Sequence, residues 1–440
     1  MIKQIKVENF KSFEKIELDL QKFNVLIGPN ASGKSNFISI FRFLKDIAVS
    51  GLDNAISMQG GVEYLRNIKI GSEKDLSIRV VSDAKFGFMY EYKKPQKPQL
   101  VFDIYEVDYE FSLKFHKRGR GFRVNKEILV IKYKWEKVPE NLKSKGQKKA
   151  DKKDIYKNRG LWTEYLSEGE IIFTRSNGNI HFQIKENGKA DTERIKILEE
   201  FFESPILKGI KLARNVLFIE KPYSVLTFPL IEIFKDIGIY DFDPKLSKKA
   251  YPITGKADLE ENGENLALIL RSIIQNKEKR QKLFNLIKEL LPFVENLGVE
   301  KFADKSLLFK LKEVYYEEKY IPASLISDGT INATALILAL YFDKKNLVII
   351  EEPERNIHPS LISKVVSMMK ETSKKKQIIV TTHNPELVKH AGLDNLLLIT
   401  RDKKGFSQIL KPKESKEVQI FLQNEIGIDE LYVQNLLEVQ

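Results

Sequence analysis

The sequence predicts an α/β fold whose central parallel sheet takes strands from opposite ends of the chain, and three observations predict it. An apolar run, Phe23 to Ile27, leads into the glycine-rich segment Gly28 to Ser35 (GPNASGKS), after which apolar residues recur at helical spacing. Between residues 326 and 400, strand-like apolar runs alternate with helical patterns. One of these runs, Leu347 to Ile350, ends in two carboxylates. Such alternation is typical of a doubly wound sheet covered by helices.

The glycine-rich segment has the pattern G-x-x-x-x-G-K-[ST] of a phosphate-binding loop. Its glycines let the backbone turn sharply and bring N–H groups to phosphate oxygens, while the following helix offers the positive end of its dipole. We expect Lys34 to reach the β- and γ-phosphates of a nucleoside triphosphate and Ser35 to hold Mg²⁺. The residues expected to bind the nucleotide in this loop are Asn30, Ala31, Ser32, Gly33, Lys34 and Ser35.

The two carboxylates that follow Leu347 to Ile350 are Glu351 and Glu352. A side chain at the carboxyl end of a buried parallel strand points into the crevice where a phosphate loop also opens. We therefore expect Glu351 to hold Mg²⁺ through water and Glu352 to orient the water that attacks the terminal phosphate.

Composition excludes several classes of protein. The chain has 440 residues, 42% of them hydrophobic, which is enough for two or three domains with real cores. No apolar run approaches 18 residues, and the first ten residues alternate charged and apolar side chains, so we expect neither a membrane span nor a signal peptide. The absence of cysteine excludes disulfides, a thiolate nucleophile and cysteine zinc sites, and fits a cytoplasmic location.

The positive charge is concentrated in one segment. Between Lys114 and Arg159 there are 17 Lys or Arg and 5 Asp or Glu, an excess of 12 that equals the net charge of +12. A strip of this kind suits nucleic-acid phosphates and base stacking on its aromatic residues. The alternative is a solvated, lysine-rich insertion whose aromatic residues lie in the core. Those aromatic residues are Phe115, Phe122, Tyr133 and Trp135.

The patterns divide the chain into four ranges. Residues 1–75 hold two strands, the strand and loop described above, and the helix after them. Residues 76–190 alternate like an antiparallel sheet, and residues 191–320 are expected to be mainly helical, without the sustained heptads of a long coiled coil. Residues 321–440 complete the α/β sheet.

Four motifs, in this order, resemble those of the ABC-class ATPases of the RecF/SMC/OLD type. The opening Ile5 to Phe13 (IKVENFKSF) is also similar to the N-terminal strand of that group. The lack of a long coiled coil, with the Gly60-Gly61 and Asp258 to Arg271 patches, looks most like the compact AAA_21-type predicted ATPases. The motifs are Gly28 to Ser35 as Walker A, Ile326 to Thr330 (ISDGT) as the signature, Ile350 to Pro359 (IEEPERNIHP) as Walker B with the D-loop, and Val380 to Leu387 (VTTHNPEL) as the switch-histidine segment.

The resemblance implies a P-loop NTPase fold: an ABC-type ATPase head with an inserted strand-rich arm and a helical subdomain. It assigns the Walker B carboxylate to Glu351, the catalytic base to Glu352, and a contact with the γ-phosphate to His383. Ser327 and Gly329 would contact the γ-phosphate bound by the opposite subunit, which implies a homodimer with ATP at its interface. As ordinary local structure, Ser327 or Asp328 can also cap the helix that follows.

The sequence departs from the family pattern in places. Glu351 stands where many relatives have aspartate, and the longer side chain can still bind metal. Gln59, in Met58 to Gly61 (MQGG), is the candidate for the glutamine that contacts the metal, the alternative being a polar loop residue. His358 is expected to support the D-loop. Residues 416–440 are too few for the nuclease domain that OLD-type proteins append, so we expect no nuclease activity in this chain.

We therefore expect an ATPase that hydrolyses ATP to ADP and phosphate and whose ATP-driven dimerisation is coupled to DNA or to a partner protein, such as a separately encoded nuclease or effector, as in DNA repair or phage defence. One alternative is the nucleotide-binding subunit of an ABC transporter, although the diverged signature and the strand-rich insertion argue against it. Another is an ATP switch without significant turnover. A small-molecule kinase would leave His383 and Ser327 unexplained.

Overall fold

The structure is a computed structural model that describes residues 1–90, 99–116, 121–138, 163–187, 192–202, 211–220, 228–316, 319–423 and 426–437. Its contacts divide the chain into two units, each made of two stretches of sequence. Unit 1 comprises Met1–Asp19 and Phe43–Lys235, and unit 2 comprises Leu20–Arg42 and Asp236–Gln440.

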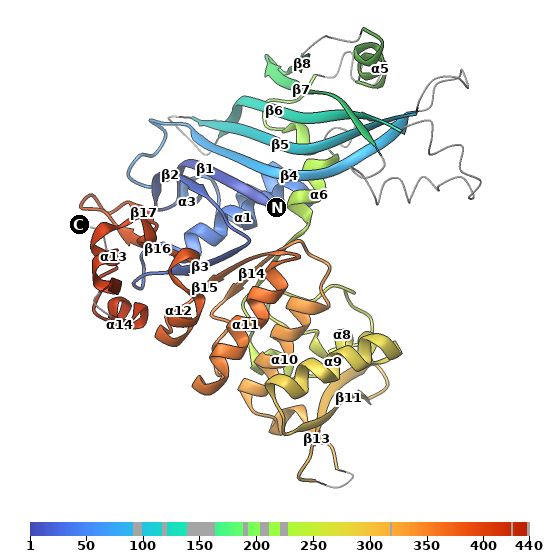
Figure 1. Ribbon diagram of the computed structural model, residues 1–440, viewed down its shortest axis with the longest axis vertical. Coiled ribbons are helices and arrows are strands. Elements are labelled where there is room, and N and C mark those ends of the chain that lie inside the picture. Colours follow the sequence, from blue (N-terminus) through green and yellow to red (C-terminus); the bar gives the residue numbers. More distant parts are fainter. Residues whose placement is uncertain are drawn as a thin grey trace. The chain divides into compact units, whose positions relative to one another are not determined.

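Unit 1 is built on a seven-stranded antiparallel sheet in the order β2-β1-β4-β5-β6-β7-β8 (Figure 1). The two N-terminal strands therefore share a sheet with the strands predicted as a separate insertion. The strands are β1 (Ile2–Phe10), β2 (Phe13–Asp19), β4 (Leu76–Tyr90), β5 (Leu100–Phe115), β6 (Phe122–Lys137), β7 (Glu164–Ser176) and β8 (Asn179–Asn187). The helices of this unit include α2 (Leu52–Met58), α3 (Val62–Leu65), α5 (Thr192–Phe202) and α6 (Phe228–Lys235).

Aromatic side chains form much of the core of this sheet. The ring of Phe102 lies 5.0 Å from that of Trp135 and 5.1 Å from that of Tyr133, and both Trp135 and Tyr133 are fully buried. Phe115 is also buried, at 3% exposure. Three of the four aromatic residues considered for base stacking therefore lie in the core, which contradicts a stacking role for these three and agrees with the alternative stated above.

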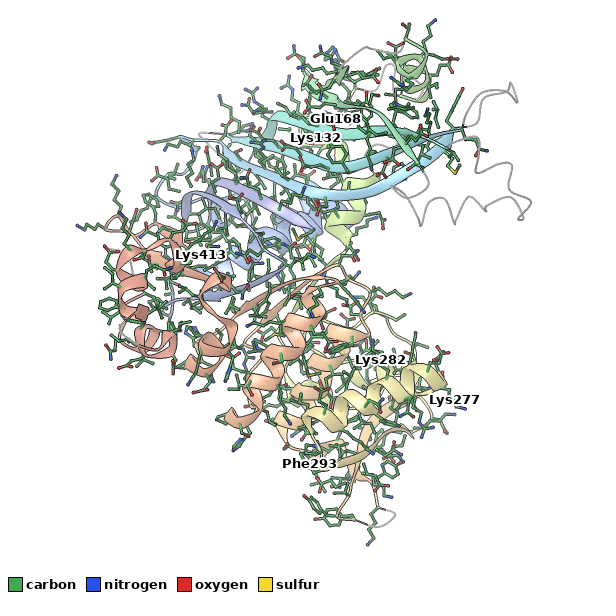
Figure 2. The ribbon with its side chains drawn as sticks, viewed as in Figure 1. Lys132, Glu168, Lys277, Lys282, Phe293 and Lys413 are labelled. Carbon is green, nitrogen blue, oxygen red and sulfur yellow. The ribbon has the colours of Figure 1, made fainter. Side chains whose placement is uncertain are left out.

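Three lysines of the basic segment are paired with carboxylates on neighbouring strands. Lys132 lies 2.8 Å from Glu106, Lys126 lies 2.7 Å from Glu110, and Lys137 lies 2.8 Å from Glu164. Figure 2 shows Lys132 and Glu168 on β6 and β7 of this sheet. Opposite charges on neighbouring strands stabilise a sheet modestly. The lysine-rich residues 139–159 lie outside the described residues.

Unit 2 contains the predicted parallel sheet. Six strands lie in the order β17-β16-β3-β15-β14-β9, all parallel to their neighbours except β17. They are β3 (Phe23–Ile27), β9 (Ile237–Tyr240), β14 (Leu347–Glu351), β15 (Gln377–Thr381), β16 (Leu396–Arg401) and β17 (Ser407–Leu410). The four central strands are almost continuously apolar and buried, as expected for a parallel sheet covered on both faces. The predicted α/β fold class is confirmed.

Helices pack on this sheet and follow its strands. The first, α1 (Lys34–Ser50), begins inside the phosphate loop, and with 17 residues it is the longest helix in the described part of the chain. The helices that belong wholly to unit 2 are α7 (Pro244–Ser247), α8 (Leu266–Ile274), α9 (Lys277–Leu290), α10 (Asp328–Tyr341), α11 (Ile362–Ser373), α12 (Pro385–Ala391), α13 (Lys416–Gln423) and α14 (Ile428–Val433). Among the described helices, none has the length and hydropathy that a membrane span requires.

The range 191–320, predicted to be mainly helical, contains strands as well. The short strand β9 extends the parallel sheet, and β11 (Val294–Phe302) pairs with β12 (Ser306–Glu313) in a small second sheet. Four apolar residues cannot be assigned to strand or helix by periodicity, which explains the failure at β9. The alternation in β12 was readable, because Leu307, Phe309 and Leu311 all point to the core. The predicted domain boundaries at 75, 190 and 320 stay predictions.

Candidate nucleotide site

The phosphate loop leaves β3 through a glycine that no other residue can replace. Gly28 has φ of 143°, and a Cβ there would lie 2.1 Å from the carbonyl oxygen of Ile399 on β16. Gly33, just before α1, has φ of 121°. Both conformations lie in the region that favours glycine, so the loop needs these residues for its path as well as for contact with phosphate.

Hydrogen bonds hold the loop in shape. The Lys34 ammonium donates to the carbonyl oxygens of Gly28 (2.8 Å) and Pro29 (2.9 Å). On the other side, the Arg401 guanidinium donates twice to the carbonyl oxygen of Ala31, at 3.1 and 2.9 Å. Burial lowers the pKa of Lys34, and the nearby carboxylate of Glu352 opposes this shift. These hydrogen bonds shape the loop around the partly buried Lys34 ammonium group.

The two carboxylates stand at the carboxyl end of β14, next to the loop. Glu351 is the last residue of the strand, and burial raises the pKa of its carboxyl group, with a further rise from Asp241 and opposition from Arg42. Glu352 has the left-handed φ of 46°, and its backbone N–H donates to the carbonyl oxygen of Thr381 (3.0 Å) at the end of β15. The left-handed backbone at Glu352 therefore turns its side chain in a different direction from that of Glu351.

An arginine holds Glu352 in place. Arg355 donates from Nε and Nη2 to Oε2 of Glu352, both at 3.1 Å, and from Nη1 to Oδ1 of Asp241 at 2.8 Å. Asp241 directly follows β9, the strand beside β14. Since charge-assisted bonds to arginine fix the orientation of a carboxylate, Glu352 is oriented by a clasp that spans two strand ends.

His383 follows β15 in a segment that is tied to the Walker B region. The Thr382 hydroxyl donates to the buried carboxylate of Glu354, and the backbone N–H of Asn384 donates to the Thr382 oxygen at 2.9 Å. Burial lowers the pKa of His383, Lys34 lowers it further, and Glu352 opposes both. The imidazole is therefore neutral near pH 7 and can offer an N–H donor or a lone-pair acceptor.

These groups meet at one cavity of about 470 Å³ at the carboxyl ends of the strands. A volume of this size suits a drug-sized or nucleotide-sized ligand. The cavity is lined by Asn30, Ala31, Gly33, Lys34, Ser35, Asn36, Glu351, Glu352, Thr381, His383 and Arg401. Eight of these residues were predicted from the sequence as site residues.

The residues fit a nucleotide with Mg²⁺. The Ser35 hydroxyl and the Glu351 carboxylate are the oxygen ligands that Mg²⁺ prefers, and both line the cavity. Lys34 supplies the cation for phosphate, and the buried Ser32 hydroxyl has no hydrogen-bond partner among the described residues. Buried polar atoms normally have partners, so an unpaired hydroxyl in a phosphate loop fits a site that binds a polar ligand.

Four predicted site residues do not line this cavity. Ser32 is buried beneath the loop, where its carbonyl oxygen accepts from Ser407. Gln59 belongs to unit 1, where it ends α2 and is buried at 8% exposure, so its role as a metal ligand stays a prediction. The remaining two, Ser327 and Gly329, lie at the start of α10.

The start of α10 is capped and packed against the D-loop. The Ser327 hydroxyl accepts from the backbone N–H of Thr330 (3.2 Å), which confirms the predicted helix cap. A Cβ at Gly329 would lie 2.2 Å from the carbonyl oxygen of Asn356, and Asn332 donates to the carbonyl oxygen of Arg355 (2.9 Å). The signature and the D-loop therefore form one surface within the chain.

Sequence reasoning missed three charged residues in or beside the cavity. Arg401 ends β16, a predicted apolar run, so the strand-end rule that identified Glu351 would also have found it. Asp241 was missed because β9 was not recognised. Arg355 lies inside the quoted Walker B segment, but its partners are visible only in the folded chain.

Comparison with known proteins identifies the family. The family model AAA_21, described as "AAA domain, putative AbiEii toxin, Type IV TA system", matches residues 23–389. Endonuclease GajA of Bacillus cereus (strain VD045) is 22% identical over 403 residues, which cover 90% of this chain and 57% of GajA. This chain thus spans less than two thirds of that relative's length.

Shorter similarities involve other proteins. The chromosome partition protein Smc of Methanocaldococcus jannaschii is 46% identical over 44 residues, or 10% of this chain and 4% of Smc. The Septu protein PtuA of Bacillus thuringiensis is 25% identical over 108 residues, or 22% of this chain and 27% of PtuA. Among solved structures, an Smc head bound to the C-winged helix domain of ScpA has a TM-score of 0.45 at 14% identity and covers 93% of this chain and 97% of the matched chain.

Proposed function

The chain belongs to the AAA_21 family of AAA domains, an SMC/OLD-like ATPase family, and from this premise we propose that it binds ATP with Mg²⁺ and hydrolyses it to ADP and phosphate. One observation carries the proposal: a cation, a hydroxyl, two carboxylates and a neutral imidazole from three strand ends line a single cavity. These are the groups needed to bind a triphosphate, hold a metal and position water.

Each residue has a separate task in this proposal. Lys34 and the loop N–H groups bind the phosphates, and Ser35 with Glu351 holds Mg²⁺, which neutralises charge on the phosphates when it is bound. Glu352 accepts a hydrogen bond from the attacking water and takes its proton, while His383 donates to the γ-phosphate. Catalysis then rests on positioning and charge, without a covalent intermediate.

We further propose that two copies of the chain close on ATP. Ser327 and Gly329 lie outside the cavity of their own chain, while the capped start of α10 offers N–H groups to an anion. Closure would bring this surface to the γ-phosphate held by the other copy. The dimer would transmit its state to DNA or to a partner protein, as in DNA repair or phage defence, and a cytoplasmic location belongs to the same proposal.

An ATP switch without significant turnover is the second candidate. The two hydrogen bonds from Arg355 support it, because they occupy Oε2 of Glu352, one of the two carboxylate oxygens that could accept from water. Both functions require ATP binding. Only an ATPase would release phosphate at a rate that depends on Glu352.

The test combines phosphate release with light scattering. Parent protein with Mg²⁺ and ATP should release phosphate, with and without added DNA compared. Glu352→Gln should accumulate uncleaved ATP and shift toward twice the mass with ATP but not with ADP, since a ligand favours the state that binds it better.

Ser327→Arg, added to Glu352→Gln, supplies the control. It should abolish the shift in mass while leaving ATP binding by each copy intact, because Ser327 lies outside the cavity of its own chain. An unchanged assembly state under both nucleotides would contradict the dimer, and binding without phosphate release would favour the switch.

A further inference from the structure

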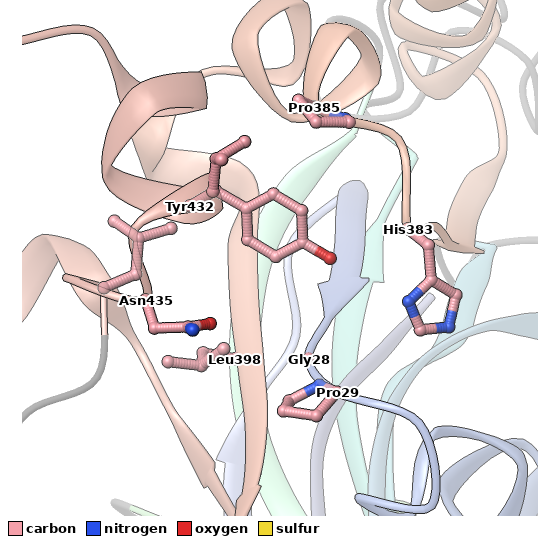
Figure 3. Close-up of a pocket in the computed structure, with 9 residues that line it drawn as sticks. Gly28, Pro29, His383, Pro385, Leu398, Tyr432 and Asn435 are labelled. Carbon is pink, nitrogen blue, oxygen red and sulfur yellow. The ribbon is translucent and has the colours of Figure 1, made fainter.

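A second cavity borders the start of the phosphate loop and β16. It has a volume of about 280 Å³ and is lined by the first two loop residues, Gly28 and Pro29, by His383, and by side chains of the C-terminal helix region. Figure 3 shows the Tyr432 hydroxyl pointing into the space between His383 and Gly28. His383 lines both this cavity and the nucleotide cavity.

The Tyr432 hydroxyl faces the backbone of the loop. The tyrosine is partly buried, and burial raises the pKa of its hydroxyl, with a further rise from Glu354, while the backbone N–H of Gly28 hydrogen-bonds it and opposes the shift. A Cβ at Gly28 would lie 2.1 Å from the carbonyl oxygen of Ile399, so the backbone of β16 also packs closely against this residue. A single hydroxyl thus contacts the residue at which the loop begins.

Tyr432 is held by the helix that carries it. Leu431, its neighbour in α14, is fully buried, and α14 packs on α12. Asp429 of α14 also lies 3.6 Å from Lys389 of α12. Since α12 begins at Pro385, two residues after His383, α14 contacts both segments that border the predicted γ-phosphate position.

We propose that Tyr432 is a positioning residue for nucleotide binding, which sets the first turn of the phosphate loop from α14 and couples that helix to the nucleotide. The proposal rests on the proposed function, because it deepens the role of the same loop. The Tyr432 hydroxyl holds Gly28 in position, and the packing of α14 on α12 links this contact to His383.

Coupling runs in both directions. If ATP draws the loop into its bound shape, the contact with Tyr432 and the packing of α14 must become more stable. Conversely, whatever moves α14 must change the affinity for ATP by the same factor. The C-terminal helix is then the element through which a partner reads or sets the nucleotide state.

The experiment compares Tyr432→Phe with parent protein in two arms. Phenylalanine keeps the ring and removes only the hydroxyl. In the first arm, without nucleotide, hydrogen exchange of a peptide spanning residues 23–33 should become faster in the variant, since the Gly28 N–H loses its partner. In the second arm, ATP affinity should fall by about three- to tenfold, the usual effect of one hydrogen bond, and ATP should slow exchange in residues 428–433 of the parent only.

Tyr341→Phe is the matched control. The Tyr341 hydroxyl donates to Glu371 (3.2 Å) in the same unit, away from both cavities. That variant should lose a tyrosine hydroxyl without changing ATP affinity or the exchange of residues 23–33.

The two arms separate failure of this inference from failure of the proposed function. Parent protein that binds no ATP would refute the proposed function, while faster exchange of residues 23–33 in Tyr432→Phe would still support the contact. Parent protein that binds ATP, with equal affinity and equal exchange in Tyr432→Phe, would overturn the positioning role.

Discussion

The two units use charge in opposite ways. In unit 1, Lys126, Lys132 and Lys137 form ion pairs across neighbouring strands, and one carboxylate, Glu127, is fully buried with Tyr109 and Arg175 as partners. In unit 2, Lys34, Glu351, Glu352 and Arg401 line a cavity, and Arg355 hydrogen-bonds Glu352. The same residue types thus build a sheet in one unit and a binding site in the other.

Sheet topology explains the difference. An antiparallel sheet places opposite charges on facing positions, where they neutralise each other. A parallel sheet collects its strand ends at one edge, where side chains from distant parts of the chain converge without filling the space between them. Charged residues therefore indicate a binding site only where they line a cavity. Matched substitutions of charged residues in the two units test this rule.

The largest expected effect is that of Glu352→Gln on hydrolysis. The variant should lower the rate of phosphate release by about 10²–10⁴-fold, the usual contribution of a positioned general base, and should bind ATP as the parent does. Glu106→Gln, which removes a carboxylate paired with Lys3 and Lys132 in unit 1, is the control and should leave the rate unchanged. Equal rates in parent and Glu352→Gln would remove Glu352 from the mechanism.

Lys34→Ala should weaken ATP binding by about 100-fold, because the β- and γ-phosphates lose their charge-assisted partner. The matched variant is Lys132→Ala, whose ammonium group pairs with Glu106 on the surface of unit 1. It should bind ATP normally in the same calorimetric titration. Retained affinity in Lys34→Ala would disprove the assignment of the phosphate loop.

The sequence predicted local features of both units, but not the contacts between residues far apart in the chain. Contiguous motifs located β3, the phosphate loop, α1 and the Walker B strand, because each carries its signal within a few residues. The clasp of Glu352 by Arg355 and Asp241 could not be predicted, since it depends on β9, a strand too short to recognise. In unit 1 the strands were readable from alternation, but the pairing of β1 with β4 was not, because register is a property of two strands at once.

Glu127 offers a test of the buried charge in unit 1. Burial raises its pKa to about 7 and outweighs the hydrogen bonds from Tyr109 and the Phe218 N–H and the pairing with Arg175. A carboxyl group whose folded pKa lies above its unfolded value stabilises the protein at low pH, and this contribution is lost as the pH rises through 7. The free energy of unfolding of the parent should therefore fall by about 2 kcal/mol between pH 5 and 8 relative to Glu127→Gln.

Urea unfolding followed by the fluorescence of the buried Trp135 would measure this difference. Glu106→Gln should show the opposite sign: burial raises the pKa of Glu106, but Lys132 and Lys3 outweigh it and leave the pKa lowered. Its contribution is present above the unfolded pKa and is lost as the pH falls. A pH-independent difference between parent and Glu127→Gln would show that Glu127 is charged in the folded protein at every pH tested.

The smallest expected effect concerns the lysines outside the described residues. If residues 139–159 contact nucleic acid, neutralising Lys145, Lys148, Lys149, Lys152 and Lys153 should reduce the slope of log affinity against log salt by about one unit per lost phosphate contact. Neutralising the paired residues Lys126, Lys132 and Lys137 in the same binding assay should change the slope less. Equal slopes for the parent and the first variant would favour a solvated insertion.

During synthesis, β3 leaves the ribosome long before the strands that pair with it. This strand ends at Ile27, and its neighbour β15 begins at Gln377, 350 residues later. At a synthesis rate of about 5–20 residues per second, β3 waits roughly 20–70 s for its first partner strand. Unit 1 is complete once Lys235 has been made, so its sheet can form while β3, whose five residues are all buried in the folded protein, remains unpaired on the nascent chain. We expect chaperones that shield apolar segments to hold this stretch until β15 leaves the ribosome.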